Sequence, residues 1–91
     1  MTEKRIYLDN SATTAPSPGV AQRMLEALNV CWGNPSSVHC CGMEANKLLQ
    51  DSRQTVLSAF GIRNPAQTGA LVFTGSGTEA DNLAVTGVLT A

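Results

Sequence analysis

An apolar run that stops at a glycine turn and passes without a spacer into a helical pattern constrains this chain most. The run lies at residues 71–74, the turn contains Gly75 and Gly77, and the helical pattern begins at Thr78. Three consecutive large apolar residues favour a buried strand, and glycines favour a tight turn. This stretch therefore predicts a strand, a turn and a helix start in direct succession.

A turn of this kind can bind an anion. It directs unpaired backbone N–H groups and the positive end of the helix dipole at one point, which suits phosphate. Gly75 and Gly77 leave room for a close approach to the backbone, and Ser76 and Thr78 can add hydroxyl donors. An ordinary strand-to-helix connection with a threonine cap fits the same pattern equally well.

The periodicity of apolar residues predicts the remaining elements. We expect helices over residues 18–30, 38–60 and 78–90, and strands near residues 6–8 and 71–74. Two strands are too few for the covered sheet that such an apolar run requires, so most of the sheet is missing. The predicted fold class is therefore α/β, with the chain as the opening part of a larger protein.

Local signals mark where these helices begin and end. Ser17 is placed to cap a helix whose first residue is Pro18, and Gly61 is placed to stop the second helix. The turn chemistry of Gly33, Asn34 and Pro35 separates the first two helices.

Composition excludes several classes of function. Of the 91 residues, 43% are hydrophobic and 14% charged, and the net charge is -1. This composition does not indicate binding to nucleic acid or to an acidic ligand. No segment is long and apolar enough for a signal peptide core or a membrane span, which predicts a cytoplasmic protein. A chain this short is expected to be only marginally folded on its own.

The cysteines and the single histidine are interpreted as structural. The chain has three cysteines, Cys31, Cys40 and Cys41, and an odd number indicates reduced thiols. Their spacing includes no C-x-x-C motif, so we expect no metal site. We expect these thiols to be buried or half-buried as small hydrophobic side chains. His39 is expected to make a structural hydrogen bond.

Three motifs occur together in this chain. They are Tyr7-Leu8-Asp9-Asn10-Ser11-Ala12-Thr13-Thr14, then Gly33-Asn34-Pro35-Ser36-Ser37-Val38-His39 with Gly42 and Ala45, and Phe73-Thr74-Gly75-Ser76-Gly77-Thr78-Glu79-Ala80-Asp81-Asn82. In order and spacing they resemble the start of cysteine desulfurases, over nearly the whole chain. The resemblance implies a class V aminotransferase of fold type I, with an incomplete parallel sheet and flanking helices. It also implies an N-terminal strand and loop over residues 1–15 and the start of the large cofactor-binding domain over residues 16–91.

The resemblance implies a pyridoxal 5'-phosphate enzyme. Such enzymes convert L-cysteine to L-alanine and leave persulfide sulfur for a sulfur-acceptor protein in iron–sulfur cluster and thio-cofactor synthesis, and a homodimer is expected. Gly77 and Thr78 correspond to residues that hold the cofactor phosphate, with Ser76 as a neighbour. Family members commonly have Thr-Ser-Gly where this chain has Thr74-Gly75-Ser76, which makes Ser76 the least secure of the three.

No catalytic residue is assigned to this chain. The family's cofactor-anchoring lysine, its acidic partner of the pyridine nitrogen, its ring-stacking histidine and its sulfur-accepting cysteine all correspond to positions beyond Ala91. Lys4, Lys47 and the three cysteines match none of them. The chain alone is therefore expected to be inactive.

Three alternatives stay open from the sequence. Gly75, Gly77 and Ala80 after a strand also fit a dinucleotide-binding fingerprint. A selenocysteine lyase or another class V relative would carry similar motifs. A truncated product without function is the third alternative.

Overall fold

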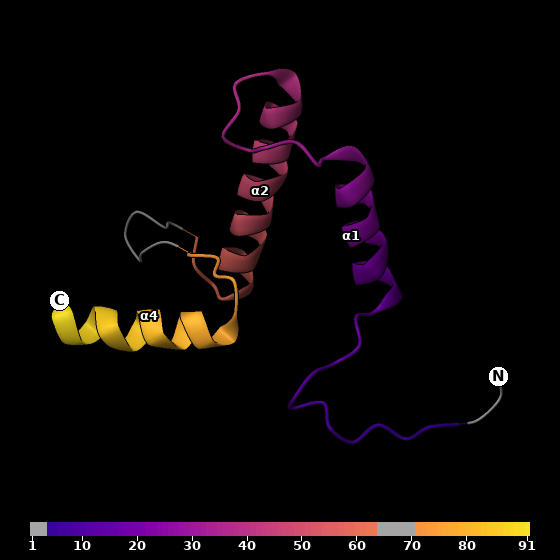
Figure 1. Ribbon diagram of the computed structural model, residues 1–91, viewed down its shortest axis with the longest axis vertical. Helices are drawn as coiled ribbons and strands as arrows, with labels where there is room; N and C mark the ends of the chain where they lie inside the picture. Colours follow the sequence, from indigo (N-terminus) through magenta and orange to yellow (C-terminus); the bar gives the residue numbers. More distant parts are fainter. Residues whose placement is uncertain (1–3, 64–70) are drawn as a thin grey trace. The chain divides into compact units, whose positions relative to one another are not determined.

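The computed structural model describes residues 4–63 and 71–91 of the chain, and the described part contains three α-helices (Figure 1). They are α1 (Pro18–Val30), α2 (Cys40–Ala59) and α4 (Gly77–Thr90). The chain divides into two compact units, residues 1–49 and 50–91. All three helices predicted from the periodicity are confirmed, with boundaries shifted by at most two residues.

Helix α1 begins as its capping sequence predicts. The hydroxyl Oγ of Ser17 accepts a hydrogen bond from the backbone N–H of Val20 at 3.3 Å, and Pro18 occupies the first helical position. Proline costs nothing there because its missing N–H has no intrahelical acceptor in any case. One exposed ion pair, Arg23 to Glu26 at 2.8 Å, lies on the surface of α1 and adds little to its stability.

Helix α2 ends at the predicted glycine. Gly61 has a φ of 76°, a left-handed conformation that favours glycine. The N–H of Gly61 donates to the carbonyl of Ser58, and the N–H of Ile62 donates to the carbonyl of Leu57, both at 2.9 Å. These two bonds form a Schellman motif, which satisfies carbonyls that the helix end would otherwise leave without donors.

The two predicted strands are absent, which corrects the α/β expectation for the described part of the chain. Residues 6–8 and 71–74 have neither strand nor helix. The physical reason is that a strand is held by hydrogen bonds to a neighbouring strand, and no ladder forms within residues 4–63 and 71–91. The apolar run is therefore present without its sheet.

Few side chains are buried. Ala45 and Leu57, both on α2, are the buried hydrophobic residues in the part that the structure describes. Large apolar side chains elsewhere stay exposed, with Trp32 at 71% and Phe60 at 77%. Among the described residues, no helix has the length and apolar character needed to cross a bilayer.

Candidate functional site

The start of α4 forms the candidate site, and Ser76 fixes where that helix begins. Ser76 is extended at the cap position, and its Oγ accepts a hydrogen bond from the N–H of Glu79 at 3.1 Å. The carbonyl of Ser76 accepts the first helical bond, from the N–H of Ala80 at 3.1 Å. Helix α4 thus begins one residue earlier than predicted, and its cap is a serine, where the simpler interpretation expected a threonine.

Glu79 completes the cap from the other side. Its Oε2 accepts a hydrogen bond from the N–H of Gly75 at 2.9 Å, next to the residue that caps the helix. A serine and a glutamate three residues apart are the signature of a capping box, and here the carboxylate reaches one residue further back than usual. Glu79 was not predicted as a capping residue, although its spacing from Ser76 carries this signal.

The backbone N–H groups of Gly77 and Thr78 are hydrogen-bond donors at the same helix end. Helix geometry leaves the N–H groups of these first two residues without an intrahelical acceptor. A Cβ added at Gly77 would meet no heavy atom within 4 Å, so no side chain crowds the Cα of this residue. Both residues are exposed. The arrangement fits the phosphate of a cofactor, because N–H donors and the positive end of the helix dipole coincide.

The turn itself is held by an internal hydrogen bond. Thr74 Oγ1 donates to the carbonyl of Ser76 at 2.9 Å. The structure thus brings the three predicted cofactor residues, Ser76, Gly77 and Thr78, into one helix start, and it directs the hydroxyl of Thr74 at their backbone.

Arg53 supports this turn from α2. Its Nη1 donates to the carbonyl of Leu71 at 2.6 Å, and its Cζ lies 5.0 Å from the centre of the Phe73 ring. Eighteen residues separate Arg53 from Leu71, so no local pattern in the sequence could have indicated this contact.

His39 has a structural role, as predicted. Its Nδ1 accepts a hydrogen bond from the N–H of Gly42 at 3.2 Å, which caps the first turn of α2. A Cβ at Gly42 would lie 2.2 Å from the carbonyl oxygen of Ser37, so only glycine fits there. The preceding turn is closed by Asn34, whose Oδ1 accepts from the N–H of Ser36 at 2.9 Å.

The cysteines are free thiols, and the prediction that they are buried is wrong for two of them. Cys40 and Cys41 are exposed in the first turn of α2, whereas Cys31 is half-buried. A hydrogen bond with Cys40 raises the pKa of the Cys41 thiol, and the neighbouring charges of Cys40 and Glu44 act in the same direction. Within residues 4–63 and 71–91, no three metal-binding side chains come together.

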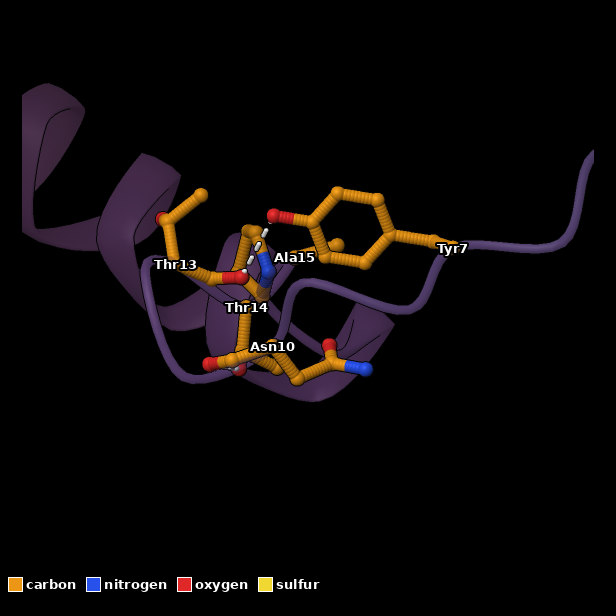
Figure 2. Close-up of a pocket in the computed structure, with 6 residues that line it drawn as sticks. Tyr7, Asn10, Thr13, Thr14 and Ala15 are labelled. Atoms are coloured by element: carbon orange, nitrogen blue, oxygen red, sulfur yellow. Dashed lines mark hydrogen bonds between the residues drawn. The ribbon is translucent and has the colours of Figure 1, made fainter.

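A second feature lies in the N-terminal segment. An open hollow of about 540 Å³ is lined by Tyr7, Asn10, Thr13, Thr14, Ala15 and Pro16. Figure 2 shows the Tyr7 ring beside this loop, with its hydroxyl directed at the backbone that follows. That hydroxyl donates to the carbonyls of Asp9 at 3.0 Å and Thr13 at 2.9 Å, so it fixes the loop.

Curated relatives are similar to this chain over most of its length. It is 40% identical to a cysteine desulfurase of Nostoc sp. over 86 residues, which are 94% of this chain and 20% of the relative. It is 43% identical to a cysteine desulfurase of Frankia sp. over 84 residues, which are 92% of this chain and 19% of the relative. A selenocysteine lyase of Bos taurus is 34% identical over 86 residues, 94% of this chain and 19% of that protein.

The chain therefore spans about a fifth of the length of these relatives. No solved structure matches it significantly. The aminotransferase class-V family matches residues 6–91, a range that includes the whole turn from Thr74 to Ala80. This match favours a pyridoxal-phosphate protein over the dinucleotide-binding alternative. The chain belongs to the aminotransferase class-V family.

Proposed function

We propose that this chain carries the cofactor-phosphate segment of a cysteine desulfurase. One observation carries the proposal: Gly77 and Thr78, whose N–H groups have no intrahelical acceptor, begin α4 inside the range that matches the class-V family. Pyridoxal phosphate has a phosphate dianion that such a helix start stabilises. Relatives named cysteine desulfurase over the same residues support this choice of enzyme.

Each residue of the site has a proposed role toward the phosphate. The N–H groups of Gly77 and Thr78 donate to its oxygens, and the hydroxyl of Thr78 adds a further donor. Ser76 already accepts the N–H of Glu79, so its hydroxyl proton is the part that remains for the phosphate. When bound, pyridoxal phosphate supplies the electron sink that lets a carbanion form beside it.

The proposed reaction of the whole enzyme is the conversion of L-cysteine to L-alanine, with the sulfur passing to a cysteine thiol and then to a sulfur-acceptor protein. A homodimer and a cytoplasmic location complete the proposal. A specific relative, the selenocysteine lyase of Bos taurus, makes selenocysteine a second candidate substrate.

The sheet of fold type I also belongs to this proposal. Residues 71–74 carry three apolar side chains in succession, and Val72 and Phe73 are 62% and 49% exposed in this structure. We propose that this segment becomes a strand when a neighbouring strand of the enzyme lies beside it, because the ladder then satisfies its backbone groups.

The test compares cofactor binding with turnover. Pyridoxal phosphate should bind the 91-residue chain more tightly than pyridoxal, which lacks the phosphate, and NAD should not compete. Thr78→Ala should weaken the binding by roughly tenfold, because a charge-assisted hydrogen bond is lost. With L-cysteine and a reductant, sulfide release should stay at the level of the free cofactor. Equal binding of pyridoxal and pyridoxal phosphate would contradict the proposed site.

A further inference from the structure

The side chain of Arg53 connects α2 to the segment that precedes the phosphate turn. Its Nη1 donates to the carbonyl of Leu71 at 2.6 Å, and both residues are half-buried. The donor carries a full positive charge, so this hydrogen bond is stronger than one between neutral groups. Leu71 is thereby fixed to the helix at a single backbone atom.

A second contact fixes the orientation of the same segment. The guanidinium carbon of Arg53 lies 5.0 Å from the centre of the Phe73 ring, within the range of a cation–π interaction. A planar guanidinium can donate along its edge and stack with its face at the same time, which an ammonium group cannot. Two contacts from one side chain therefore hold Leu71 and Phe73 together.

The fixed segment leads directly into the turn. One residue after Phe73, Thr74 Oγ1 donates to the carbonyl of Ser76, and the N–H of Gly75 donates to Glu79 of α4. The contacts of Arg53 and the short chain from Phe73 to Ser76 thus connect α2 to the first turn of α4. A displacement of residues 71–73 would be transmitted to Ser76 and to the N–H groups that follow it.

We propose that Arg53 is a positioning residue for the phosphate site at Gly77 and Thr78. It holds the segment before the turn, and it acts on the phosphate only through that segment. The inference rests on the proposed function, since it assumes that this helix start binds the cofactor phosphate. Arg53 is not proposed as a phosphate ligand, because the contacts shown for its guanidinium are with Leu71 and Phe73.

The first part of the test needs no ligand. Amide hydrogen exchange is measured at Gly75 and Glu79, whose N–H groups are bonded to Glu79 Oε2 and Ser76 Oγ. Arg53→Gln should raise both exchange rates by about tenfold, whereas the exposed Arg63 mutated to Gln should leave them unchanged. The amide of Gly61, bonded to the carbonyl of Ser58 at the end of α2, serves as the reference for unfolding of the helix that carries Arg53. Unchanged exchange rates at Gly75 and Glu79 overturn the inference, as does an equal rise at Gly61.

Two further variants separate the contacts of Arg53. Arg53→Lys keeps the charge and loses the planar group, so the exchange rates should lie between those of the wild type and Arg53→Gln. Phe73→Leu removes the ring and keeps an apolar side chain, and it should also give an intermediate rise. If Gly75 and Glu79 exchange as slowly in Arg53→Lys as in the wild type, the positive charge alone suffices. That result would contradict the proposed two-contact arrangement.

The second part uses pyridoxal phosphate. Arg53→Gln should weaken its binding by about tenfold while the helical signal in circular dichroism stays constant. Binding as tight as in the wild type overturns the inference. If the wild type itself binds no pyridoxal phosphate, the proposed function fails, and the exchange rates still decide whether Arg53 positions the turn.

Discussion

The carboxylate of Glu79 accepts the N–H of Gly75 at 2.9 Å, so a negative charge lies at the helix end proposed to receive a phosphate. The bond stabilises the start of α4, since a carboxylate there interacts favourably with the helix dipole. It also engages the Gly75 N–H, so this donor is not available to an incoming anion.

This relationship makes Glu79→Gln a test of the charge balance at the site. The glutamine oxygen can still accept the Gly75 N–H, while the repulsion between a carboxylate and a phosphate is removed. At about 4 Å in water that repulsion is worth about 1 kcal/mol, so inorganic phosphate should bind about fivefold more tightly. Isothermal titration gives the dissociation constants, with Glu44→Gln on α2 as the matched control. Weaker binding in Glu79→Gln would show that the carboxylate does not face the anion.

Gly42 and Gly19 form a matched pair for the packing at the start of α2. A Cβ at Gly42 would lie 2.2 Å from the Ser37 carbonyl oxygen, whereas a Cβ at Gly19 would meet nothing within 4 Å. Gly42→Ala should therefore raise the exchange rate of the Met43 amide, which is bonded to the His39 carbonyl, by about tenfold or more. Gly19→Ala should leave that rate unchanged. Equal effects of the two substitutions would refute the close contact.

The raised pKa of Cys41 predicts slow alkylation. Less of this thiol is ionised at pH 8 than in an ordinary cysteine, and only the thiolate reacts. Cys40→Ala removes the largest cause of the shift, so Cys41 should react faster with iodoacetamide at pH 8. The difference in alkylation rate between the wild type and Cys40→Ala should shrink as the pH rises, because Cys41 then ionises in both proteins. Peptide mapping by mass spectrometry measures the rates, with Cys31 as the internal reference, and identical rates at pH 8 would contradict the assignment.

The exposed apolar side chains predict a marginal fold for the 91-residue chain. Only Ala45 and Leu57 are buried hydrophobic residues within the described part, and so small a core does not support a cooperative unit. Thermal unfolding followed by circular dichroism should be broad, with no sharp midpoint. A steep transition of a monomer, confirmed by sedimentation, would show that more apolar surface is buried than this structure contains.

Local signals in the sequence predict the helices well, because their causes lie within a few residues. Ser17 and Pro18 start α1, and Gly61 ends α2 through its left-handed conformation. The predictions of strands at residues 6–8 and 71–74 were wrong. A strand forms only beside a partner strand, which can lie far away in the chain or outside it. The contacts of Arg53 could not be predicted for the same reason, whereas Glu79 could have been found from its spacing to Ser76.

Amide chemical shifts report whether the first turn of α4 binds the phosphate of pyridoxal phosphate. The 15N-labelled chain is titrated with inorganic phosphate and with pyridoxal phosphate. The amides of Gly77 and Thr78 should shift most with both ligands, Thr78→Ala should reduce these shifts, and pyridoxal, which lacks the phosphate, should cause much smaller ones. Shifts centred elsewhere in the chain, or equal shifts with pyridoxal, would contradict phosphate binding at this turn.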